Sequence, residues 1–497
     1  MVNSLPEKLI RFAQSLPYPL YVVGGKVRDF LAGLNAENPD IDICAPAHAD
    51  DFIIRAKEAG FTVDAEYKNT GTVKLTYGKD NFEFTCFRSD KYIRGEHTPA
   101  ETFFTTDINA DARRRDFKCN AVYYDIAARK IVDPLGGVED IDNKRISTVE
   151  RAEKVFGEDG LRLMRLARIA GQTGFVPTAE CLSGARANAH LIKEISAERI
   201  FAELTLILNA DKKYGISLGQ YMGLKIIYGI GVMQIILPEL CEGAGVVQNK
   251  KYHKYDVLEH SVRCAAYADE SIRLAALLHD VGKPYCFKTF GNFIDHDREG
   301  ARIAADICRR LKVSKKLTEQ TVKLVELHMY DLRCDAKENK VRKFIVENYG
   351  LFDKILLIKQ ADYSACTDDF KKAPSVEKLE GIFQKMKGEG VPFTLKQLLI
   401  KGNDLLDIGV PAEEVGKTLN LLLLDCAINL VANDKEKLLT RTKKVYLPAL
   451  NPQVYAVYAK EFNAEREEKR AARAEYVARK KAERAANKSK KGGGNGQ

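Results

Sequence analysis

The hydrophobic pattern of this 497-residue chain changes once, near residue 145, and no other feature constrains its fold as strongly. Before that point, short runs rich in β-branched and aromatic residues, such as TVKLTYG and FEFTCF, alternate with turn residues. Two helix-like segments, about 26–34 and 49–59, interrupt these runs. After that point apolar residues recur at spacings of three and four, as in DGLRLMRLARIAGQTGF. The pattern predicts an α+β head followed by an all-α remainder.

Length and composition indicate a water-soluble, multidomain chain. A chain of 497 residues can bury several cores. No run of about 18 uncharged apolar residues is present, and the start lacks the basic end and apolar core of a signal peptide. The 11 cysteines form no CxxC pair, which favours reduced thiols. We therefore expect a cytoplasmic protein with no membrane partner, and nothing indicates an obligate protein partner.

The positive charge is concentrated near the C-terminus. The net charge is +9, and residues 460–491 contain 12 Lys/Arg against 6 Asp/Glu. Basic side chains that neutralise phosphates release counterions, so this distribution suits a polyanion such as RNA. A solvated helix without a binding role explains the same composition. Both interpretations stay open.

A glycine pair between a predicted strand and a predicted helix provides the first candidate site. Gly24 and Gly25 end the run YVVGG, and the helix after them carries Arg28. Glycines allow backbone N–H groups at a helix N-terminus to approach phosphate oxygens. Arg28 could hold the same phosphate by charge. Most glycine pairs only turn the chain, so this pair becomes informative only together with an acidic strand next to it.

Two aspartates occupy the next predicted strand. Asp40 and Asp42 alternate with isoleucines, so both carboxylates share one face of the strand. Adjacent like charges are costly unless a cation bridges them, and hard oxygen ligands favour Mg²⁺. Glu83, in NFEFTCFR, is the third candidate carboxylate, although it could be only an exposed strand residue. The set predicts two-metal-ion phosphoryl transfer with Asp40, Asp42 and Glu83 as catalytic residues.

Four motifs in order resemble those of bacterial CCA-adding enzymes and their poly(A) polymerase relatives. They are Gly-Gly-Lys-Val-Arg-Asp, Asp-Ile-Asp, Arg-Arg-Asp-Phe with Asn-Ala, and Glu-Asp with a following Arg, within about residues 15–240. The resemblance implies a polymerase-beta-like nucleotidyltransferase head followed by an all-α neck, body and tail. It also implies that CTP, ATP and tRNA are bound. The nucleotide-binding positions that it implies are Gly24, Gly25, Arg28, Arg115, Asp116, Asp159, Arg162, Arg165 and Arg168.

Side-chain chemistry supports a base-reading role for two of these residues. Cytosine and adenine both present an amino donor beside a ring-nitrogen acceptor, whereas uracil and guanine present the reverse. Ionised Asp159 can only accept and Arg162 can only donate, so the pair complements C and A. Their spacing of three predicts that they lie side by side on the neck helix. The same rotation turns Arg168 away from Asp159, and a solvated helix face is an alternative for Arg165 and Arg168.

The polar segment from Arg88 to Arg115 is long and weakly periodic, as functional or mobile loops often are. By the resemblance it corresponds to the flexible loop that helps the family switch from adding C to adding A. Its length favours a full CCA-adding enzyme.

Histidines and aspartates gather in the segment after residue 250. Four of the chain's eight histidines occur here in the ligand order of HD-type phosphohydrolases. The resemblance implies a second divalent ion (Mn, Ni, Co or Mg) that activates water, with phosphatase or 2′,3′-cyclic phosphodiesterase activity. An HD fold that only supports RNA is the alternative. The predicted ligands are His260, His279, Asp280, His296, His328 and Asp362.

We interpret the chain as an enzyme that adds C, C and A to the 3′ end of tRNA without a template. A poly(A) polymerase and an enzyme that adds only CC or only A are alternatives within the same chemistry. An HD phosphohydrolase with an RNA-binding head is an alternative from another class. The predicted domains are the head at 1–145, the neck at 146–247, the HD domain at 248–372, the helical tail at 373–458, and a basic, partly disordered extension at 459–497.

Overall fold

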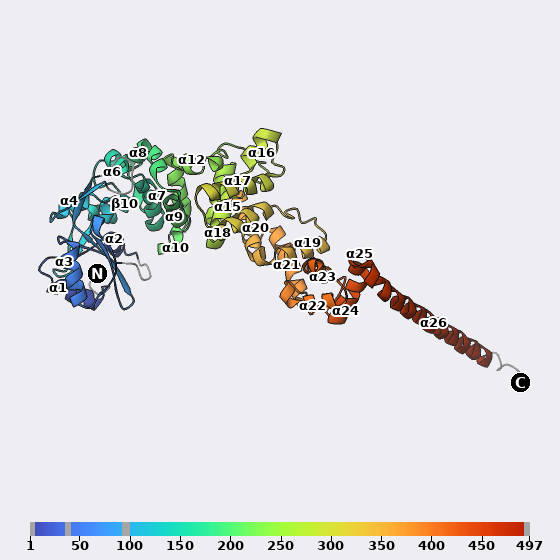
Figure 1. The fold of residues 1–497 in the computed structure, drawn as a ribbon. Helices are drawn as coiled ribbons and strands as arrows, with labels where there is room; N and C mark the ends of the chain where they lie inside the picture. Colours follow the sequence, from blue (N-terminus) through green and yellow to red (C-terminus); the bar gives the residue numbers. More distant parts are fainter. Residues whose placement is uncertain (1–4, 35–40, 92–99, 492–497) are drawn as a thin grey trace. The chain divides into compact units, whose positions relative to one another are not determined.

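The computed structural model describes residues 5–34, 41–91 and 100–491, and these form two compact units (Figure 1). One unit comprises the described residues up to Tyr330 together with Lys354–Ala373. The other comprises Asp331–Asp353 together with the described residues from Pro374 onward. Residues 331–353, which we assigned from sequence to the HD domain, thus cluster with the tail. The domain limits drawn from sequence stay predictions.

The head is a mixed sheet of seven strands in the order β3-β4-β5-β2-β1-β8-β9. Six of the strands lie where the hydrophobic runs predict them, and β3 was missed. Their bounds are β1 Tyr21–Val23, β2 Ile41–Ala45, β3 Thr62–Tyr67, β4 Thr72–Tyr77, β5 Asp80–Cys86, β8 Tyr123–Asp125 and β9 Lys130–Val132. The head helices are α1 Glu7–Ser15, α2 Gly25–Leu31, α3 Ala49–Glu58, α4 Ile108–Arg113 and α5 Gly137–Asp142.

Alternation along β2 and β5 separates a core face from a polar face. Ile41, Ile43 and Phe84 are at most 5% exposed, and the Phe84 ring stacks on Phe52 of α3 with centroids 3.6 Å apart. A strand turns successive side chains to opposite faces, so the residues between these apolar ones point away from the core. This packing fixes which way the acidic residues of both strands face.

The segment between Arg88 and Arg115 is more regular than its sequence suggests. Strands β6 Arg88–Lys91 and β7 Glu101–Phe104 pair as an antiparallel hairpin, and α4 comes after them. The prediction of a loop throughout is therefore wrong for these parts, because cross-strand pairing can order a polar run that lacks apolar periodicity. Residues 92–99, which also belong to the predicted flexible loop, lie outside the described residues.

From residue 147 onward the described chain is almost entirely helical, as predicted, apart from the two-residue strand β11 Val176–Pro177, which pairs with β10 Arg145–Ile146. Helix α7 is buried on nearly all sides and packs on α9, α10 and α11. A Cβ at Gly171 of α7 would lie 2.4 Å from the Gly219 carbonyl oxygen of α11, so glycine permits this close approach. The neck helices are α6 Ala152–Glu158, α7 Leu161–Thr173, α8 Ala179–Ala187, α9 Ala197–Leu208, α10 Ala210–Tyr214, α11 Gly219–Gly229, α12 Met233–Ile236 and α13 Pro238–Cys241.

The remaining helices divide between the two units. Those of the first unit are α14 Val257–Tyr267, α15 Arg273–Leu278, α16 Lys283–Phe290, α17 His296–Arg310, α18 Lys315–Leu327 and, from its third residue onward, α20 Phe352–Thr367. Those of the second are α19 Glu338–Glu347, α21 Pro374–Gly388, α22 Gly402–Asp407, α23 Val415–Ala427, α24 Lys435–Arg441, α25 Leu447–Leu450 and α26 Pro452–Lys491. The basic extension is thus helical as far as residue 491. The predicted disorder of the final glycine-rich residues falls on 492–497, outside the described residues.

The described part of the chain also bears on the expectations about membrane spans and cysteine pairing. Within it, no helix has both the length and the apolar character needed to cross a membrane. All 11 cysteines lie in described segments, and each is a free thiol, as expected.

Candidate functional site

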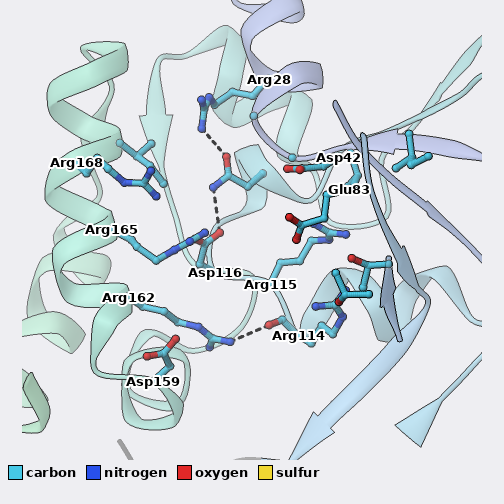
Figure 2. A pocket seen from close by; sticks show the side chains of 18 of the residues that line it. Arg28, Asp42, Glu83, Arg114, Arg115, Asp116, Asp159, Arg162, Arg165 and Arg168 are labelled. Carbon is cyan, nitrogen blue, oxygen red and sulfur yellow. Dashed lines mark hydrogen bonds and ion pairs between the residues drawn. The ribbon is translucent and has the colours of Figure 1, made fainter. Parts of the chain in front are cut away.

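A polar cavity opens between the head sheet and helix α7, and all nine predicted nucleotide-binding residues line it (Figure 2). The head contributes the glycine turn, the acidic strands and the arginines after α4. The neck contributes the α6–α7 junction and one side of α7. The predicted residues that line the cavity are Gly24, Gly25, Arg28, Asp42, Glu83, Arg115, Asp116, Asp159, Arg162, Arg165 and Arg168.

The glycine turn lies directly beside one of the acidic strands. Gly24 has a φ of +76°, and a Cβ there would lie 3.2 Å from Asp42 Oδ2. Only glycine combines that backbone conformation with so close a neighbour at little cost. Gly25 begins α2, so the turn leads into a helix N-terminus as the sequence predicts.

Asp42 and Glu83 are register partners across the parallel strands β2 and β5. Both side chains are exposed, while their chain neighbours enter the core. Figure 2 shows the two carboxylates beside each other at the cavity wall. Asp40, the other predicted metal ligand, lies outside the described residues.

A chain of hydrogen bonds joins Arg28 of the head to helix α7 of the neck. Arg28 Nη1 donates to Asn120 Oδ1 at 2.7 Å, and Asn120 Nδ2 donates to Asp116 Oδ1 at 3.0 Å. Arg165 Nε donates to the other carboxylate oxygen of Asp116 at 2.8 Å. Burial raises the pKa of Asp116, but Arg165, Asn120 and Arg162 lower it more, and the net result is far below the usual range. Asp116 is thus a charged acceptor that fixes other groups in place.

A second network orients the arginines that come after α4. Asp111 accepts from Arg114 Nε at 2.8 Å and from Arg115 Nη2 at 3.0 Å, and Tyr123 donates to it at 2.7 Å. Burial opposes ionisation of Asp111, yet Arg115, Arg114 and Tyr123 lower its pKa to about 2. Arg115 also donates to the Tyr123 hydroxyl. Sequence reasoning selected Arg115 but missed Asp111 and Tyr123, which hold it.

The expected helical pairing of Asp159 with Arg162 is wrong in its geometry. Asp159 has extended backbone angles between α6 and α7, and its carboxylate accepts the Leu161 N–H at 2.8 Å. Arg162 lies in α7 and donates to the carbonyl oxygens of Val155 and Arg114. Both still line the same cavity. The helix break, rather than a spacing of three on one helix, brings them there.

The arginines farther along α7 also differ from the expectation. Arg165 and Arg168 line the cavity, and their side chains are only 35% and 19% exposed, so they do not form a solvated helix face. Arg168 pairs with Glu203 of α9 at 2.9 Å. The rotation that should turn Arg168 from Asp159 does not apply, because Asp159 precedes the helix.

Some lining residues were not predicted from sequence. Lys213 of α10 and Gln172 of α7 reach the same cavity. Asn120 appears in a recognised motif, but no pattern indicated that it bridges Arg28 to Asp116. These residues are far apart along the chain, so only folding brings them together.

The six predicted ligands of the HD cluster (His260, His279, Asp280, His296, His328 and Asp362) lie close together. His260 Nε2 is 3.1 Å from Asp362 Oδ1 and 3.4 Å from Asp280 Oδ2. Asp280 Oδ1 is 3.3 Å from His296 Nε2 and 3.7 Å from His328 Nε2. Asp280 therefore lies between two groups of histidines. Burial raises the pKa of Asp280, but His279 and Lys283 hold it well below its usual range.

Three family models match the chain in order. A "Poly A polymerase head domain" matches residues 20–147, a "Probable RNA and SrmB- binding site of polymerase A" matches 174–243, and an "HD domain" matches 252–347. The first covers the acidic strands, Arg28 with Asn120 and Asp116, and the arginines held by Asp111. The chain is therefore similar to CCA-adding enzymes and poly(A) polymerases over its head, neck and HD regions. The resemblance inferred from sequence is confirmed.

Two curated relatives of the chain carry names that state different activities. The chain is 28% identical to the A-adding tRNA nucleotidyltransferase of Deinococcus radiodurans, over 84% of this chain and 94% of that protein. It is 35% identical to a CCA-adding enzyme of Staphylococcus aureus, over 40% of this chain and 48% of that enzyme. The match to the S. aureus enzyme thus spans about half of that protein.

Solved structures of CCA-adding enzymes share the fold. The Bacillus stearothermophilus CCA-adding enzyme in complex with CTP superimposes with a TM-score of 0.63 at 22% identity, covering 93% of this chain and 98% of that one. The Thermotoga maritima CCA-adding enzyme in complex with tRNA gives a TM-score of 0.53 at 17% identity, covering 87% and 92%. The predicted fold, a polymerase-like head followed by helical domains, is confirmed.

Proposed function

We propose that this chain adds C, C and A to the 3′ end of tRNA, taking the nucleotides from CTP and ATP. The observation that carries the proposal is the single cavity in which Asp42 and Glu83 face the α6–α7 junction with Asp159 and Arg162. One wall suits a triphosphate and its metal ions, and the other suits the edge of a base. Named relatives that act on tRNA, and solved relatives in complex with CTP or with tRNA, support the same function.

The residues present fit Mg²⁺. Asp42 and Glu83 are like-charged register partners on adjacent strands, an arrangement that is costly without a cation. Both offer hard oxygen donors, and we propose that Asp40 joins them as a ligand. When bound, Mg²⁺ lowers the pKa of the attacking 3′-hydroxyl and neutralises charge on the triphosphate.

The chain's own residues hold and select the nucleotide. The Gly24–Gly25 turn at the start of α2 presents backbone N–H groups, and Arg28 and Arg115 add positive charge. Ionised Asp159 accepts from the amino group of cytosine or adenine, and Arg162 donates to the adjacent ring nitrogen. Hydrogen bonds from Arg162 to the carbonyl oxygens of Val155 and Arg114 hold its guanidinium in one orientation.

A primer-extension assay tests the proposal. Transfer RNA that lacks its last three nucleotides is incubated with CTP alone, ATP alone and both, and the 3′ ends are sequenced. The proposal expects two added C with CTP alone and a complete CCA with both. A long A tract would instead identify a poly(A) polymerase.

A second candidate is an enzyme that adds only the terminal A. The relative that aligns over 94% of its own length carries an A-adding name. The same assay separates the two functions when transfer RNA ending in CC is added as a second primer. An A-adding enzyme extends only that primer, and only with ATP.

We also propose that the HD cluster binds a divalent metal ion and hydrolyses phosphate esters at RNA ends. Asp280 Oδ1 lies 3.3 Å from His296 Nε2 and 3.7 Å from His328 Nε2, yet none of these three buried atoms makes a hydrogen bond among the described residues. Atoms that converge without hydrogen bonding one another fit the ligands of a metal ion. Mn, Ni, Co and Mg are the ions to test. Release of phosphate from 2′,3′-cyclic or 3′-phosphate substrates, measured with each ion, decides whether this cluster is catalytic or structural.

A further inference from the structure

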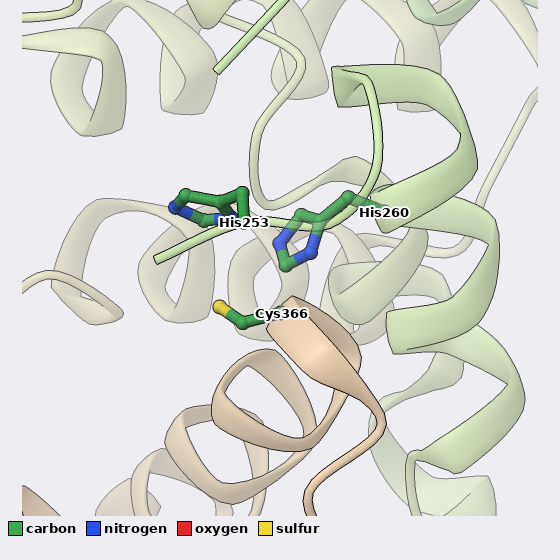
Figure 3. Close-up of side chains that lie close together, drawn as sticks. All are labelled: His253, His260 and Cys366. Atoms are coloured by element: carbon green, nitrogen blue, oxygen red, sulfur yellow. The ribbon is translucent and has the colours of Figure 1, made fainter. Parts of the chain in front are cut away.

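Three side chains form a second group at the edge of the HD cluster (Figure 3). His253 comes from the segment before α14, His260 from α14 and Cys366 from α20, which lies about a hundred residues further along the chain. One donor atom of each, a ring nitrogen or the thiol sulfur, lies within 4.8 Å of the other two. Cys366 Sγ is also 4.0 Å from Asp362 Oδ1. Neither His253 nor Cys366 was among the predicted ligands.

His260 differs from the other histidines of the HD cluster in what its Nδ1 atom contacts. His279, His296 and His328 each place Nδ1 2.7–2.8 Å from a backbone carbonyl oxygen, respectively of Ala276, Phe293 and Val325. Such contacts fix the ring of a metal-binding histidine. Among the described residues, Nδ1 of His260 has no hydrogen-bond partner, although the side chain is fully buried.

The neighbouring His253 ring also has a nitrogen without a hydrogen-bond partner among the described residues. This atom, Nδ1, is buried as well. The two rings lie edge to face, with centroids 5.1 Å apart. Buried polar atoms are nearly always satisfied. Two rings that each carry an orphaned nitrogen, and each place a donor atom within 4.8 Å of the Cys366 thiol, therefore indicate a ligand that both rings could bind.

The donor types restrict that ligand. Two imidazoles and a thiolate suit a thiophilic transition-metal ion such as Zn²⁺ or Co²⁺ and do not suit Mg²⁺. Asp280 and Asp362 place negative charge nearby, and the Lys283 ammonium contacts Asp280. An imidazole has a nitrogen on each side of its ring, so His260 can take part in both the HD cluster and the second group.

We propose that His253, His260 and Cys366 bind a thiophilic divalent metal ion, at a position beside the HD cluster and distinct from it. On binding, the Cys366 thiol releases its proton to solvent and its sulfur bonds to the metal. When the HD cluster also holds an ion on the other nitrogen of His260, the ring releases its N–H proton to solvent as well and bridges the two ions as an imidazolate. The proposed metal site shares no residue with the nucleotide-adding cavity, so the proposal can be tested independently of CCA addition.

Cobalt spectroscopy of the full-length protein tests the site directly. Chelator-stripped protein is titrated with Co²⁺, and the near-ultraviolet thiolate-to-cobalt charge-transfer band and the bound metal are measured. We expect wild type to show the band, and Cys366→Ser to lose it together with about one equivalent of bound metal. His253→Ala should weaken the Co²⁺ affinity reported by the band about tenfold or more.

Two cysteine variants serve as controls. Cys334→Ser removes another partly exposed thiol, from the second compact unit, and should leave the band unchanged. Cys264→Ser removes a buried thiol that interacts with His279 and should also leave it. A wild type without the band, a band that survives in Cys366→Ser, or a band lost only in Cys264→Ser would each overturn the proposal.

Discussion

Glu83 stands directly opposite Asp42 in the parallel pairing of β5 with β2, and Lys74 of β4 stands opposite Glu83 on its other side. The side chains of Lys74, Glu83 and Asp42 thus form a row across three adjacent strands, with one ammonium followed by two carboxylates. The ammonium can offset one carboxylate, but the charge next to the glycine turn remains negative. This end of the row, nearest Gly24, is where we propose that the metal ions bind.

Asp42→Asn and Glu83→Gln should each lower nucleotide addition, and the loss should be larger for Asp42, which contacts the glycine turn. Loss of one metal-binding carboxylate should reduce kcat by about a hundredfold or more for both CTP and ATP. Glu66→Gln, on the exposed edge strand β3, is the matched control and should retain activity. Wild-type turnover in Asp42→Asn would remove this carboxylate from the mechanism.

Asp159→Ala should relax base selection without weakening RNA binding. Loss of one acceptor of a paired contact should cost about 1–3 kcal/mol of discrimination against UTP and GTP. Competition between radiolabelled CTP and UTP measures that ratio, with the exposed Glu180→Gln of α8 as control. A variant that still excludes UTP and GTP as strictly as wild type contradicts the base-reading role.

Selection should also depend on pH. Burial raises the pKa of Asp159, against the opposing effects of the Leu161 N–H and Arg162. As the pH falls, the Asp159 carboxylate therefore becomes protonated at a higher pH than an exposed aspartate does, and it then no longer acts only as an acceptor. Discrimination against UTP should decline on acidification in wild type and stay flat in Asp159→Ala.

Asn120→Ala should disturb nucleotide binding through Arg28 and Arg165, which it links by way of Asp116. Removing it leaves buried groups short of a partner, at a cost of roughly 1–3 kcal/mol. We expect KM for CTP and ATP to rise about tenfold while kcat changes less. Asn143→Ala removes an exposed amide that bonds only locally, to the Glu139 carbonyl oxygen, and should match wild type. Equal KM values in both variants would show that the link does not matter for binding.

Asp111 should make the head sensitive to acid. Its folded pKa of about 2 lies below its ordinary value, so its contribution is present above about pH 4 and is lost as the pH falls towards 2. Asp111→Asn should therefore destabilise the head by about 2 kcal/mol at pH 7, with a difference that shrinks below about pH 4.

Pulsed deuterium labelling can measure this effect in the full-length protein. Samples are equilibrated in urea at each pH and labelled briefly at one fixed pH, and peptides covering residues 107–126 are read. The exposed Asp64→Asn of β3 provides the control. A difference between Asp111→Asn and wild type that stays constant from pH 7 to pH 3 would contradict the assigned pKa.

Local sequence patterns were enough to predict several parts of this protein. Alternation fixed the outward direction of Asp42 and Glu83, because a strand whose isoleucines and phenylalanines enter the core must turn the residues between them outward. The switch from strand to helix near residue 145 likewise results from the spacing of apolar residues. Motif order was enough to indicate the resemblance to CCA-adding enzymes and the residues that gather in the HD cluster.

Contacts between distant segments depend on how the elements pack, and no local pattern revealed them. Residues 92 positions apart in the chain, Arg28 and Asn120, form a hydrogen bond that no periodicity could indicate. The extended backbone at Asp159 is a break within a helical run, and neck packing rather than local propensity can impose it. His253, His260 and Cys366 meet because α14 and α20 pack around the same buried centre. Local rules set which way a side chain leaves its own element, whereas the packing of elements sets which other side chains it meets.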